Sequence, residues 1–311
     1  MENQCLGLAE ALGVQPLVKR VHPRAPWKFL PARLWWRPLR TCSSAADRFE
    51  PPWPELLISC GRRSVAVAVA VRRASAGRTF AVHIQDPYGQ ARHFDLVVVP
   101  RHDTLRGENV IVTRGALHRV TAERLAAAAR RFAPALAHLP RPLVAVLVGG
   151  SNRRQRIDPV VIGDLAERLV AMARTQGAGL AVTASRRTGA ENERVLRERL
   201  AAVASVVWDG TGENPYFGYL GLADAIVVTG DSVSMVSEAC STGKPVYVYD
   251  LEGGSKRLQR FHEGLRADGI TRPFEGRLEH WTYPPLNETA QVAELVRARL
   301  RQRFASGLRT P

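Results

Sequence analysis

Short stretches rich in Val, Leu and Ile alternate with helical patterns along nearly the whole chain, and this alternation constrains the fold most strongly. The expected strands of a first series are Leu17–Val21, Leu56–Ser59, Phe80–Ile84, Leu96–Val99 and Asn109–Val112. Those of a second series are Leu143–Val148, Gly179–Thr183, Ser205–Trp208, Ala225–Val228 and Pro245–Tyr249. Strands this apolar are buried on both faces, as in parallel sheets. The sequence therefore predicts an α/β fold with two doubly wound halves.

The expected helices and the Pro-rich stretches divide the chain. Helical periodicity predicts Leu6–Leu12, Thr121–Phe132, Pro159–Thr175, Ala190–Ala201, Ser234–Ser241 and Thr289–Gly307. The Pro-punctuated stretch 133–142 predicts a boundary between a domain at 1–139 and a second at 142–287. We expect the last helix, 288–307, to cross back onto the first domain. A doubly wound half ordinarily opens with a strand, so we expect a first strand to be missing before Glu2, through a truncated or misassigned start; a fold that simply begins with a helix is the alternative.

Composition excludes several classes of protein. Apolar residues make up 45% and charged residues 23%, which excludes a disordered or collagen-like chain. The four cysteines form no CxxC pair, so we expect no structural metal and a reducing compartment. The longest apolar runs, 65–71 and 143–150, are shorter than the roughly 18 residues that a spanning helix needs. The opening residues carry no secretory signal, and we expect a cytoplasmic protein.

The positive charge gathers in the first part of the chain. The net charge is +15, and residues 1–140 hold 21 Lys and Arg against 10 Asp and Glu. Within segment 19–40 aromatic and basic side chains alternate, notably Trp27, Trp35, Trp36 and Arg37. This pattern suits the anionic surface of a membrane, here the inner membrane face, and equally a loop packed against the first domain. Stacking on single-stranded nucleic acid is a third reading that no RRM, KH or helix-turn-helix signature supports, so we expect no nucleic acid.

Polar residues follow the strands of the second series, where open α/β sheets bind ligands. They are Gly149, Gly150 and Ser151, then Ser185 and Arg186, then Asp231, Ser232 and Ser234. Glycine and serine at the start of a helix offer N–H and hydroxyl donors to an anion. Glu238 lies one helical turn beyond Ser234, where it could accept hydrogen bonds from a ribose. Strand-to-helix turns, a plain N-cap and a surface charge are the alternatives.

The pattern S-x-S-x-x-x-E-A at 232–239, followed by G-x-P-V at 243–246, resembles the donor-nucleotide site of GT-B glycosyltransferases. More specifically, the chain resembles the mitochondrial fission (elongated mitochondria) family known from plants, and its bacterial relatives. The matching segments are 2–4, 6–9, 59–63, 85–87, 94–95, 100–103, 113–118, 149–151, 183–188, 214–216 and 228–235.

The resemblance implies a GT-B-like fold, with two Rossmann-like domains whose parallel sheets face an interdomain cleft. It implies that the second domain binds a nucleotide sugar as donor substrate, with Asn214 among its contacts and no further cofactor. The acceptor side falls on Glu2, Asn3, Gln4 and Arg62. A general base there falls on His102, Asp103 or Asp86, each of which follows a strand of the first series. Hydrogen bonding within the loops is the alternative for each of these three.

Three functions remain open on these grounds. The first is a metal-independent glycosyltransferase that acts near the inner membrane face. The second is a non-catalytic adaptor that recruits a division or envelope protein, because plant members of the resembled family act in organelle division and a fold alone does not fix a function. The third is an epimerase or hydrolase of nucleotide sugars. The base, sugar, acceptor and protein partner are not identified by the sequence.

Overall fold

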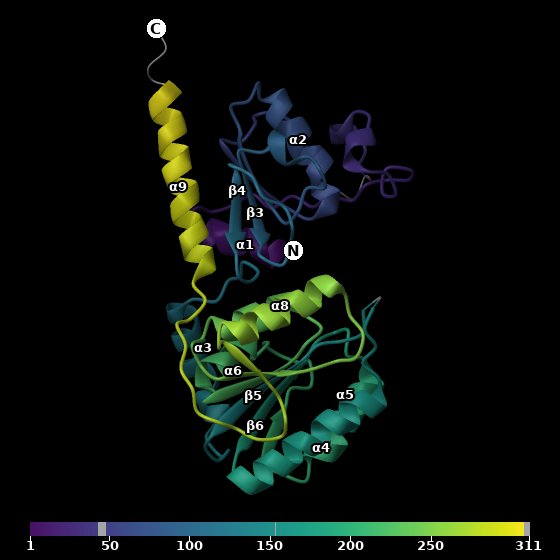
Figure 1. Ribbon diagram of the computed structural model, residues 1–311, viewed down its shortest axis with the longest axis vertical. Coiled ribbons are helices and arrows are strands. Elements are labelled where there is room, and N and C mark those ends of the chain that lie inside the picture. The colour runs from purple at the N-terminus through teal and green to yellow at the C-terminus, as the bar shows by residue number, and fades with distance from the viewer. Residues whose placement is uncertain (43–47, 153, 308–311) are drawn as a thin grey trace. The chain divides into compact units, whose positions relative to one another are not determined.

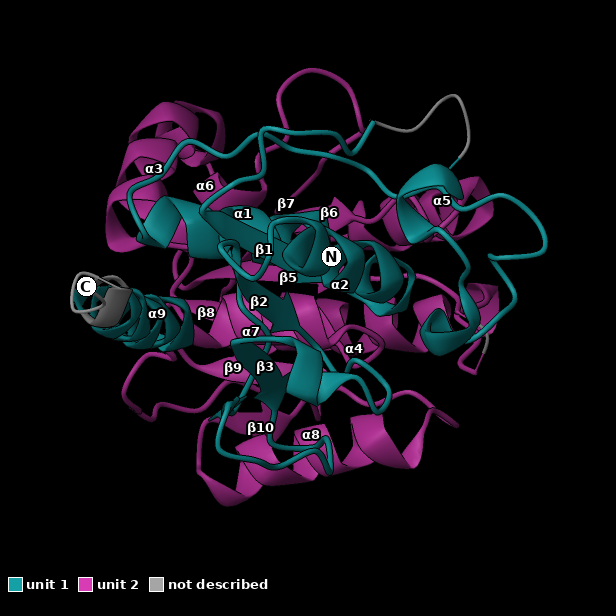
Figure 2. Cartoon of the chain, turned by 90° about the horizontal axis from the view of Figure 1, so that it is seen from above, with its two compact units in different colours: residues 1–119, 287–311 teal, residues 120–286 magenta. Residues whose placement is uncertain are grey.

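The computed structural model describes residues 1–42, 48–152 and 154–307, and the chain forms two compact units (Figures 1 and 2). Unit 1 comprises Met1–Arg119 with Asn287–Pro311, and unit 2 comprises Val120–Leu286. Helix α3 (Ala122–Leu136) belongs to unit 2, so the first unit ends before the Pro-rich stretch at which the sequence placed the boundary.

Unit 1 is a parallel four-stranded sheet with helices on both faces. Its strands are β1 (Leu56–Cys60), β2 (Phe80–Ile84), β3 (Leu96–Pro100) and β4 (Val110–Thr113), in that spatial order. Its α-helices are α1 (Glu2–Ala11), α2 (Val65–Ala74) and α9 (Glu288–Gly307). Its described residues also form short 3₁₀ helices: η1 (Ala32–Leu34), η2 (Pro38–Arg40), η3 (Arg62–Ser64) and η4 (Ala91–His93).

Alternate residues of the central strands bury both faces of this sheet. Phe80, Val82 and Ile84 of β2 pack in one cluster with Leu8 of α1 and Val292 of α9. The residues between them, and their neighbours on β3, pack against α2 on the other face. This follows from the two-residue period of a strand, which sends successive side chains to opposite sides.

The first turn of α9 is fastened to the segment that follows β4. Glu288 is only 5% exposed and accepts hydrogen bonds from the Gly115 N–H at 2.8 Å and from Arg114 Nε at 3.3 Å. Thr289 Oγ1 accepts from the His118 N–H at 3.0 Å and donates to the His118 carbonyl at 3.1 Å. The motif at 113–118 therefore holds in place a helix that is about 170 residues later in the chain.

Unit 2 is a parallel six-stranded sheet with the order β10-β9-β8-β5-β6-β7. The strands are β5 (Leu143–Val148), β6 (Gly179–Ala184), β7 (Ser205–Val207), β8 (Ala225–Thr229), β9 (Val246–Tyr249) and β10 (Thr271–Pro273). The helices besides α3 are α4 (Pro159–Gln176), α5 (Ala190–Leu200), α6 (Tyr216–Leu222), α7 (Val233–Cys240) and α8 (Lys256–Ala267). All residues of β5, β8 and β9 are buried, so helices cover both faces of the sheet.

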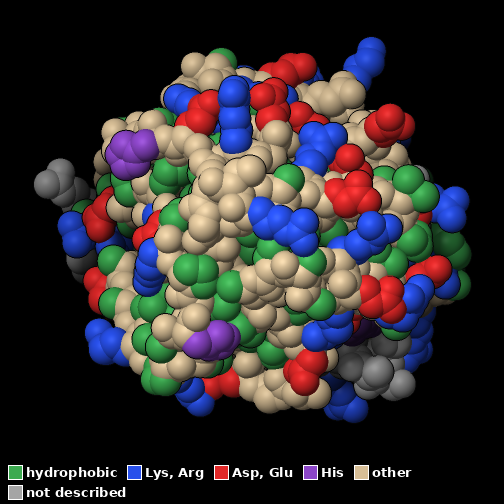
Figure 3. All heavy atoms as spheres, turned by 90° about the horizontal axis from the view of Figure 1, so that it is seen from below, with side chains coloured by type: hydrophobic (Ala, Val, Ile, Leu, Met, Phe, Trp, Pro, Cys, Tyr) green, Lys and Arg blue, Asp and Glu red, His purple; other side chains and the backbone are tan. Residues whose placement is uncertain are grey.

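Local sequence signals begin and end the longest helix of unit 2. Asp158 caps α4, because its carboxylate accepts the N–H groups of Val160 and Val161, both at 3.1 Å. Pro159 occupies the first helical position, where its missing N–H costs nothing. Gly177 ends the helix in the left-handed conformation, at φ 66°. On the face of the chain drawn in Figure 3, basic and acidic side chains are interspersed, as expected for solvated helices.

Two expectations for the start of the chain are wrong. Leu17–Val21 is not a strand; Leu17 is 85% exposed and Val18 39% exposed, while Val21 packs partly buried against the cluster around Trp35. The first helix also begins earlier than expected, at Glu2 rather than Leu6. Glu2, Asn3 and Gln4 therefore form its first turn and are not a loop before it.

Candidate functional site

The candidate site lies at the carboxyl edge of the sheet of unit 2. β5 pairs in parallel with both β6 and β8, so the loops that follow these three strands emerge next to one another. The loops are 149–151, 185–188 and 230–232, and they carry most of the predicted site residues. The sheet topology thus brings together residues that are far apart in the sequence.

Asp231 connects the three loops. Its side chain is fully buried, and its carboxylate accepts hydrogen bonds from the Thr229 hydroxyl at 2.7 Å, the Gly150 N–H at 3.2 Å and Arg187 Nη2 at 3.2 Å. The Gly149 N–H donates to Thr229 Oγ1 at 2.8 Å. The N–H groups of both glycines are therefore used inside the protein. In this structure they are not open to a phosphate.

The two glycines allow the loops to approach closely. A Cβ atom on Gly149 would lie 2.0 Å from Asp231 Oδ1. A Cβ atom on Gly150 would lie 2.2 Å from the backbone carbonyl carbon of Arg187. Contacts this short cannot be accommodated, so packing alone accounts for glycine at both positions.

The polar side chains on the first two loops differ in how many of their hydrogen-bonding groups already have partners within the protein. Ser151 Oγ accepts the Ile157 N–H at 2.9 Å and donates to the Ile157 carbonyl at 3.1 Å. Ser185 Oγ accepts the Arg187 N–H at 3.1 Å. Arg186 is exposed and has no ion-pair partner among the residues that the structure describes. The Arg186 guanidinium and the hydroxyl hydrogen of Ser185 therefore have no acceptor among the described residues.

The N-terminus of α7 is the open part of the site. Ser232 is its N-cap and accepts the Met235 N–H at 3.3 Å. No described residue accepts from the N–H groups of Val233 and Ser234 or bonds the Ser234 hydroxyl. Unpaired N–H groups at the start of a helix, together with the helix dipole, favour an anion.

Glu238 lies one turn further along α7 and is tied to the Asn214-Pro215-Tyr216 motif. The Tyr216 hydroxyl donates to Glu238 Oε2 at 2.6 Å, and Asn214 Oδ1 accepts the Tyr216 N–H at 2.9 Å. Burial raises the pKa of Glu238, and the hydrogen bond from Tyr216 acts in the opposite direction. Burial and the neighbouring carboxylate raise the pKa of Tyr216. The sequence did not suggest the contact with Tyr216, which lies 22 positions before Glu238.

In unit 1, the parallel pairing of β2 with β3 places the predicted bases on loops that begin at neighbouring strand ends. Asp86 is partly buried, and its Oδ1 accepts the Tyr88 N–H at 2.7 Å, which closes a tight turn. His102 and Asp103 are buried, and the Asp103 N–H donates to the Pro100 carbonyl at 2.9 Å. Asp86 thus has a structural role as well as its proposed chemical one.

The predicted acceptor residues at the start of the chain make contacts inside unit 1. Glu2 is exposed and forms a salt bridge with Arg20 at 2.9 Å, which lowers the pKa of Glu2. Gln4 is buried, and its Oε1 accepts a hydrogen bond from the Cys60 thiol at 3.6 Å. Asn3 is exposed. The structure does not gather these three residues into one pocket.

Two tryptophans of the basic and aromatic segment pack into or against the core of unit 1. Trp35 is 9% exposed and belongs to a cluster with Val67 of α2, against which Trp27 packs partly buried. Arg62 Nη2 donates to the Phe29 carbonyl at 3.2 Å and so connects the segment to η3. Packing against unit 1 therefore accounts for Trp27 and Trp35.

Most of the segment is exposed. Phe29 is 70%, Leu34 54% and Trp36 67% exposed. Arg37 lies over the ring of Trp36, with its guanidinium carbon 4.4 Å from the centroid, and Lys28 Nζ lies 4.7 Å from the centroid of Phe29. We call these five residues the exposed aromatic patch. No helix within the described parts of the chain is long and apolar enough to cross a membrane.

Comparison with protein families and individual proteins gives a consistent result. The sequence profile of the family described as "Mitochondrial fission ELM1" matches residues 1–300. The mitochondrial fission protein ELM1 of Arabidopsis thaliana is 36% identical over 286 residues, which cover 83% of this chain and 67% of that protein. An uncharacterized protein of Rickettsia prowazekii is 26% identical over 288 residues, which cover 80% of each chain.

Solved structures identify the fold. A putative UDP-N-acetylglucosamine 2-epimerase from Listeria monocytogenes matches with a TM-score of 0.53 at 14% identity, over 81% of this chain and 75% of that one. The UDP-GlcNAc 2-epimerase of Methanocaldococcus jannaschii also matches with a TM-score of 0.53, at 11% identity, over 79% of this chain and 76% of that one. The GT-B-like fold that the sequence predicted is confirmed, and identities this low say nothing further about activity.

Proposed function

The chain belongs to the mitochondrial fission ELM1 family, and from this premise we propose that unit 2 binds the nucleoside diphosphate part of a nucleotide sugar. The observation that carries the proposal is the arrangement along α7. An open helix N-terminus and a partly buried carboxylate lie one turn apart on the same helix. In a nucleotide the diphosphate and the ribose are directly linked, so an anion site and a ribose site must also lie close together.

The diphosphate would bind at the start of α7. The N–H groups of Val233 and Ser234 and the Ser234 hydroxyl are the donors that the protein leaves unused. Arg186 and the half-exposed Arg187, which follow β6, would add positive charge from the neighbouring loop. Fixed donors of this kind stabilise the charge that develops on a leaving diphosphate without requiring a metal.

The ribose would bind at Glu238. Tyr216 occupies Oε2, and Oε1 has no partner among the described residues. A carboxylate can accept from both hydroxyls of a ribose, and the Tyr216 hydroxyl would hold it in one orientation. This contact would select for a nucleotide over inorganic diphosphate.

The reaction that we propose is glycosyl transfer to an acceptor hydroxyl. Asp86, His102 and Asp103 of unit 1 are the candidates for the base that removes the proton of that hydroxyl. Epimerisation or hydrolysis of the nucleotide sugar is the alternative. Turnover of the nucleotide sugar without any added acceptor would identify the alternative.

Thermal unfolding of the purified chain with UDP, GDP, CDP, ADP and TDP and their common sugars tests the binding step. A ligand at 100 times its dissociation constant adds about 2.7 kcal/mol to the free energy of unfolding, which raises the Tm by several degrees. We expect one nucleotide to raise the Tm and Glu238→Gln to abolish that rise. Glu191→Gln, at an exposed position on α5, is the matched control. No rise with any nucleotide would contradict the proposal.

The exposed aromatic patch supports a second function, that of an adaptor docked on a membrane. Apolar rings flanked by Lys and Arg favour the interface of an anionic bilayer. We expect vesicles containing phosphatidylserine to co-sediment the protein, and the double substitution Phe29→Ser and Trp36→Ser to reduce binding by tenfold or more. Tyr88→Ser, at a side chain that is 64% exposed elsewhere in unit 1, is the control. Equal binding by both variants would exclude the patch as the docking surface.

A further inference from the structure

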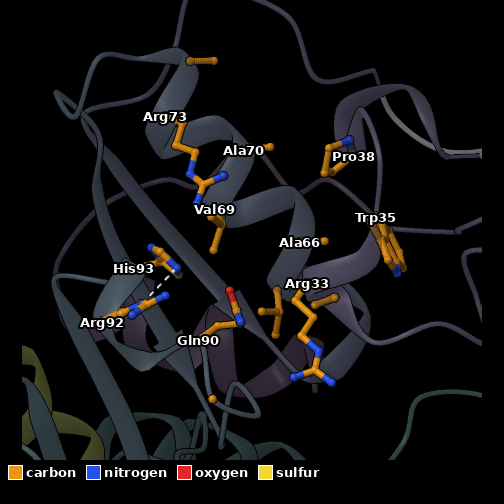
Figure 4. Close-up of a pocket in the computed structure, with 14 residues that line it drawn as sticks. Arg33, Trp35, Pro38, Ala66, Val69, Ala70, Arg73, Gln90, Arg92 and His93 are labelled. Atoms are coloured by element: carbon orange, nitrogen blue, oxygen red, sulfur yellow. Dashed lines mark hydrogen bonds between the residues drawn. The ribbon is translucent and has the colours of Figure 1, made fainter.

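A cavity of about 890 Å³ lies within unit 1, far along the chain from the α7 site of unit 2. It is bounded by α2, by the loop that contains η4 and by the segment of η1 and η2 (Figure 4). Its volume falls in the range of about 300–1,000 Å³ that is usual for small-molecule sites. None of the functions discussed above uses it.

One wall of the cavity carries positive charge that the protein does not neutralise. Arg73 of α2 and Arg92 of η4 have no carboxylate partner among the described residues, and Arg92 Nε lies 3.5 Å from His93 Nε2. In Figure 4 the guanidinium of Arg73 points toward His93, and Gln90 extends into the same space. By contrast, the nearby Arg72 is bonded to Asp95.

The pKa of His93 is consistent with the same excess of positive charge. Burial lowers the pKa of His93, and the charges of Arg73, Arg92 and Arg72 lower it further. No acidic group acts on it in the opposite direction. A negative charge placed between these side chains would be stabilised.

The rest of the lining is largely apolar, although Arg33 of η1 also borders the cavity. Ala66, Val69 and Ala70 of α2 line the cavity, and their small side chains leave the space open. Trp35 faces them from the other side, as Figure 4 shows. The Trp35 Nε1–H donates to the Leu30 carbonyl at 3.3 Å, so the polar edge of the indole is already bonded. The rest of the ring offers an apolar surface.

We propose that this cavity binds a phosphate monoester attached to a short apolar body. The phosphate would accept hydrogen bonds from Arg73 and Arg92, since a guanidinium presents paired N–H donors to phosphate oxygens. The apolar body would lie along Ala66 and Ala70. A membrane phospholipid and a soluble organic phosphate share this chemistry, and the contribution of the acyl chains to affinity distinguishes the two sources.

Isothermal titration of the full chain with monomeric probes tests the proposal. The probes are dihexanoyl phosphatidic acid, dihexanoyl phosphatidylcholine and glycerol 3-phosphate. We expect the phosphatidic acid to bind at least about tenfold more tightly than the phosphatidylcholine. We expect the double substitution Arg73→Ser and Arg92→Ser to weaken that binding at least about tenfold. Arg78→Ser removes a charge from an exposed position outside the cavity and is the control.

Two further measurements separate the parts of the site. Ala70→Phe fills the apolar side and should weaken phosphatidic acid while leaving glycerol 3-phosphate unchanged. Equal affinity for both phosphates would instead point to a soluble phosphate ligand and would overturn the apolar part of the proposal. The pKa of His93, followed by NMR, should rise when the probe binds. Equal binding by the double-arginine variant and the Arg78→Ser control, with no movement of the His93 titration, would overturn the site as a whole.

Discussion

The hydroxyl of Tyr216 donates a 2.6 Å hydrogen bond to Oε2 of Glu238, and this bond joins the start of α6 to the second turn of α7. The bond gives the Asn214-Pro215-Tyr216 motif a role beyond starting helix α6. It also makes the protonation of Glu238 sensitive to Tyr216, because burial pushes the pKa of the carboxyl upward and the hydrogen bond pulls it down.

Tyr216→Phe should therefore move the pH dependence of nucleotide binding. Without the hydrogen bond the pKa of Glu238 rises further, so the carboxylate that accepts from the ribose is lost at a higher pH. Titration calorimetry between pH 5 and pH 8 should show affinity falling earlier on acidification than in the parent chain. Tyr219→Phe, also on α6, is the control. Superimposable pH profiles for all three proteins would contradict this role for Tyr216.

Asp231→Ala should destabilise unit 2. The substitution leaves the buried Gly150 N–H and the Thr229 hydroxyl without their acceptor. Each buried donor left unsatisfied costs about 1–3 kcal/mol. Arg187→Ala removes only the half-exposed partner, and we expect it to cost less than about 1 kcal/mol. Urea unfolding followed by circular dichroism measures the free energy of unfolding of both variants. An equal decrease in both would show that the hydrogen bonds from the Gly150 N–H and the Thr229 hydroxyl to Asp231 contribute little.

Gly7→Ala should destabilise unit 1. A Cβ atom at this position on α1 would lie 2.3 Å from the carbonyl oxygen of His118, which α9 already holds through Thr289. We expect a loss of about 1–3 kcal/mol from overpacking. Gly163 on α4 is also helical but has nothing within 4 Å, so Gly163→Ala should raise stability by about 0.5–1 kcal/mol. If Gly7→Ala raised the stability as Gly163→Ala is expected to, the close approach of Gly7 to the His118 carbonyl would not exist in solution.

His83 should make the protein acid-sensitive. The side chain is fully buried in β2, its Nδ1 lies 2.8 Å from Ser59 Oγ, and burial lowers its pKa to about 3. The unfolded chain takes up a proton below about pH 6.5 while the folded chain does not, so stability falls as the pH is lowered through this window. The loss approaches about 1.4 kcal/mol for each pH unit.

Urea midpoints measured between pH 7 and pH 4.5 test this sensitivity. His83→Gln keeps a hydrogen-bonding side chain near Ser59 but does not titrate in this window. We expect its stability to fall less steeply than that of the parent chain. Parallel curves would show that other groups cause the acid sensitivity.

The central elements of the fold could be predicted from the sequence because burial there is complete. Phe80–Ile84 and Leu143–Val148 are strands with the expected bounds, and every residue of both is buried. Failures occurred where hydrophobic periodicity was weak or misleading. Leu17 and Val18 resemble a strand, yet they lie exposed. Helix α6 was missed because its glycines and aromatic residues have low helical propensity.

The site could be predicted only in part, for a physical reason. Strand ends showed which loops meet, because parallel pairing places them at one edge. The sequence could not show which donors the protein uses for itself. Gly149 and Gly150 have the composition of an anion-binding loop, but Asp231 and Thr229 take their N–H groups. Such competition depends on distances of a few ångströms between loops that lie about 80 positions apart.

The attachment of Glu288 to Gly115 has a consequence for synthesis of the chain on the ribosome. Unit 2 is one continuous stretch and can fold as soon as residue 286 has emerged. Unit 1 is translated first but must wait, since Val292 and Val296 cover one face of its sheet. Before α9 is synthesised, Leu8 and Phe80 lack their contacts with Val292 and Val296. Apolar surface exposed in this way promotes aggregation. Unit 2 can therefore fold before unit 1 although it is translated later, and the emergence of α9 ends the period in which one face of the unit 1 sheet is uncovered.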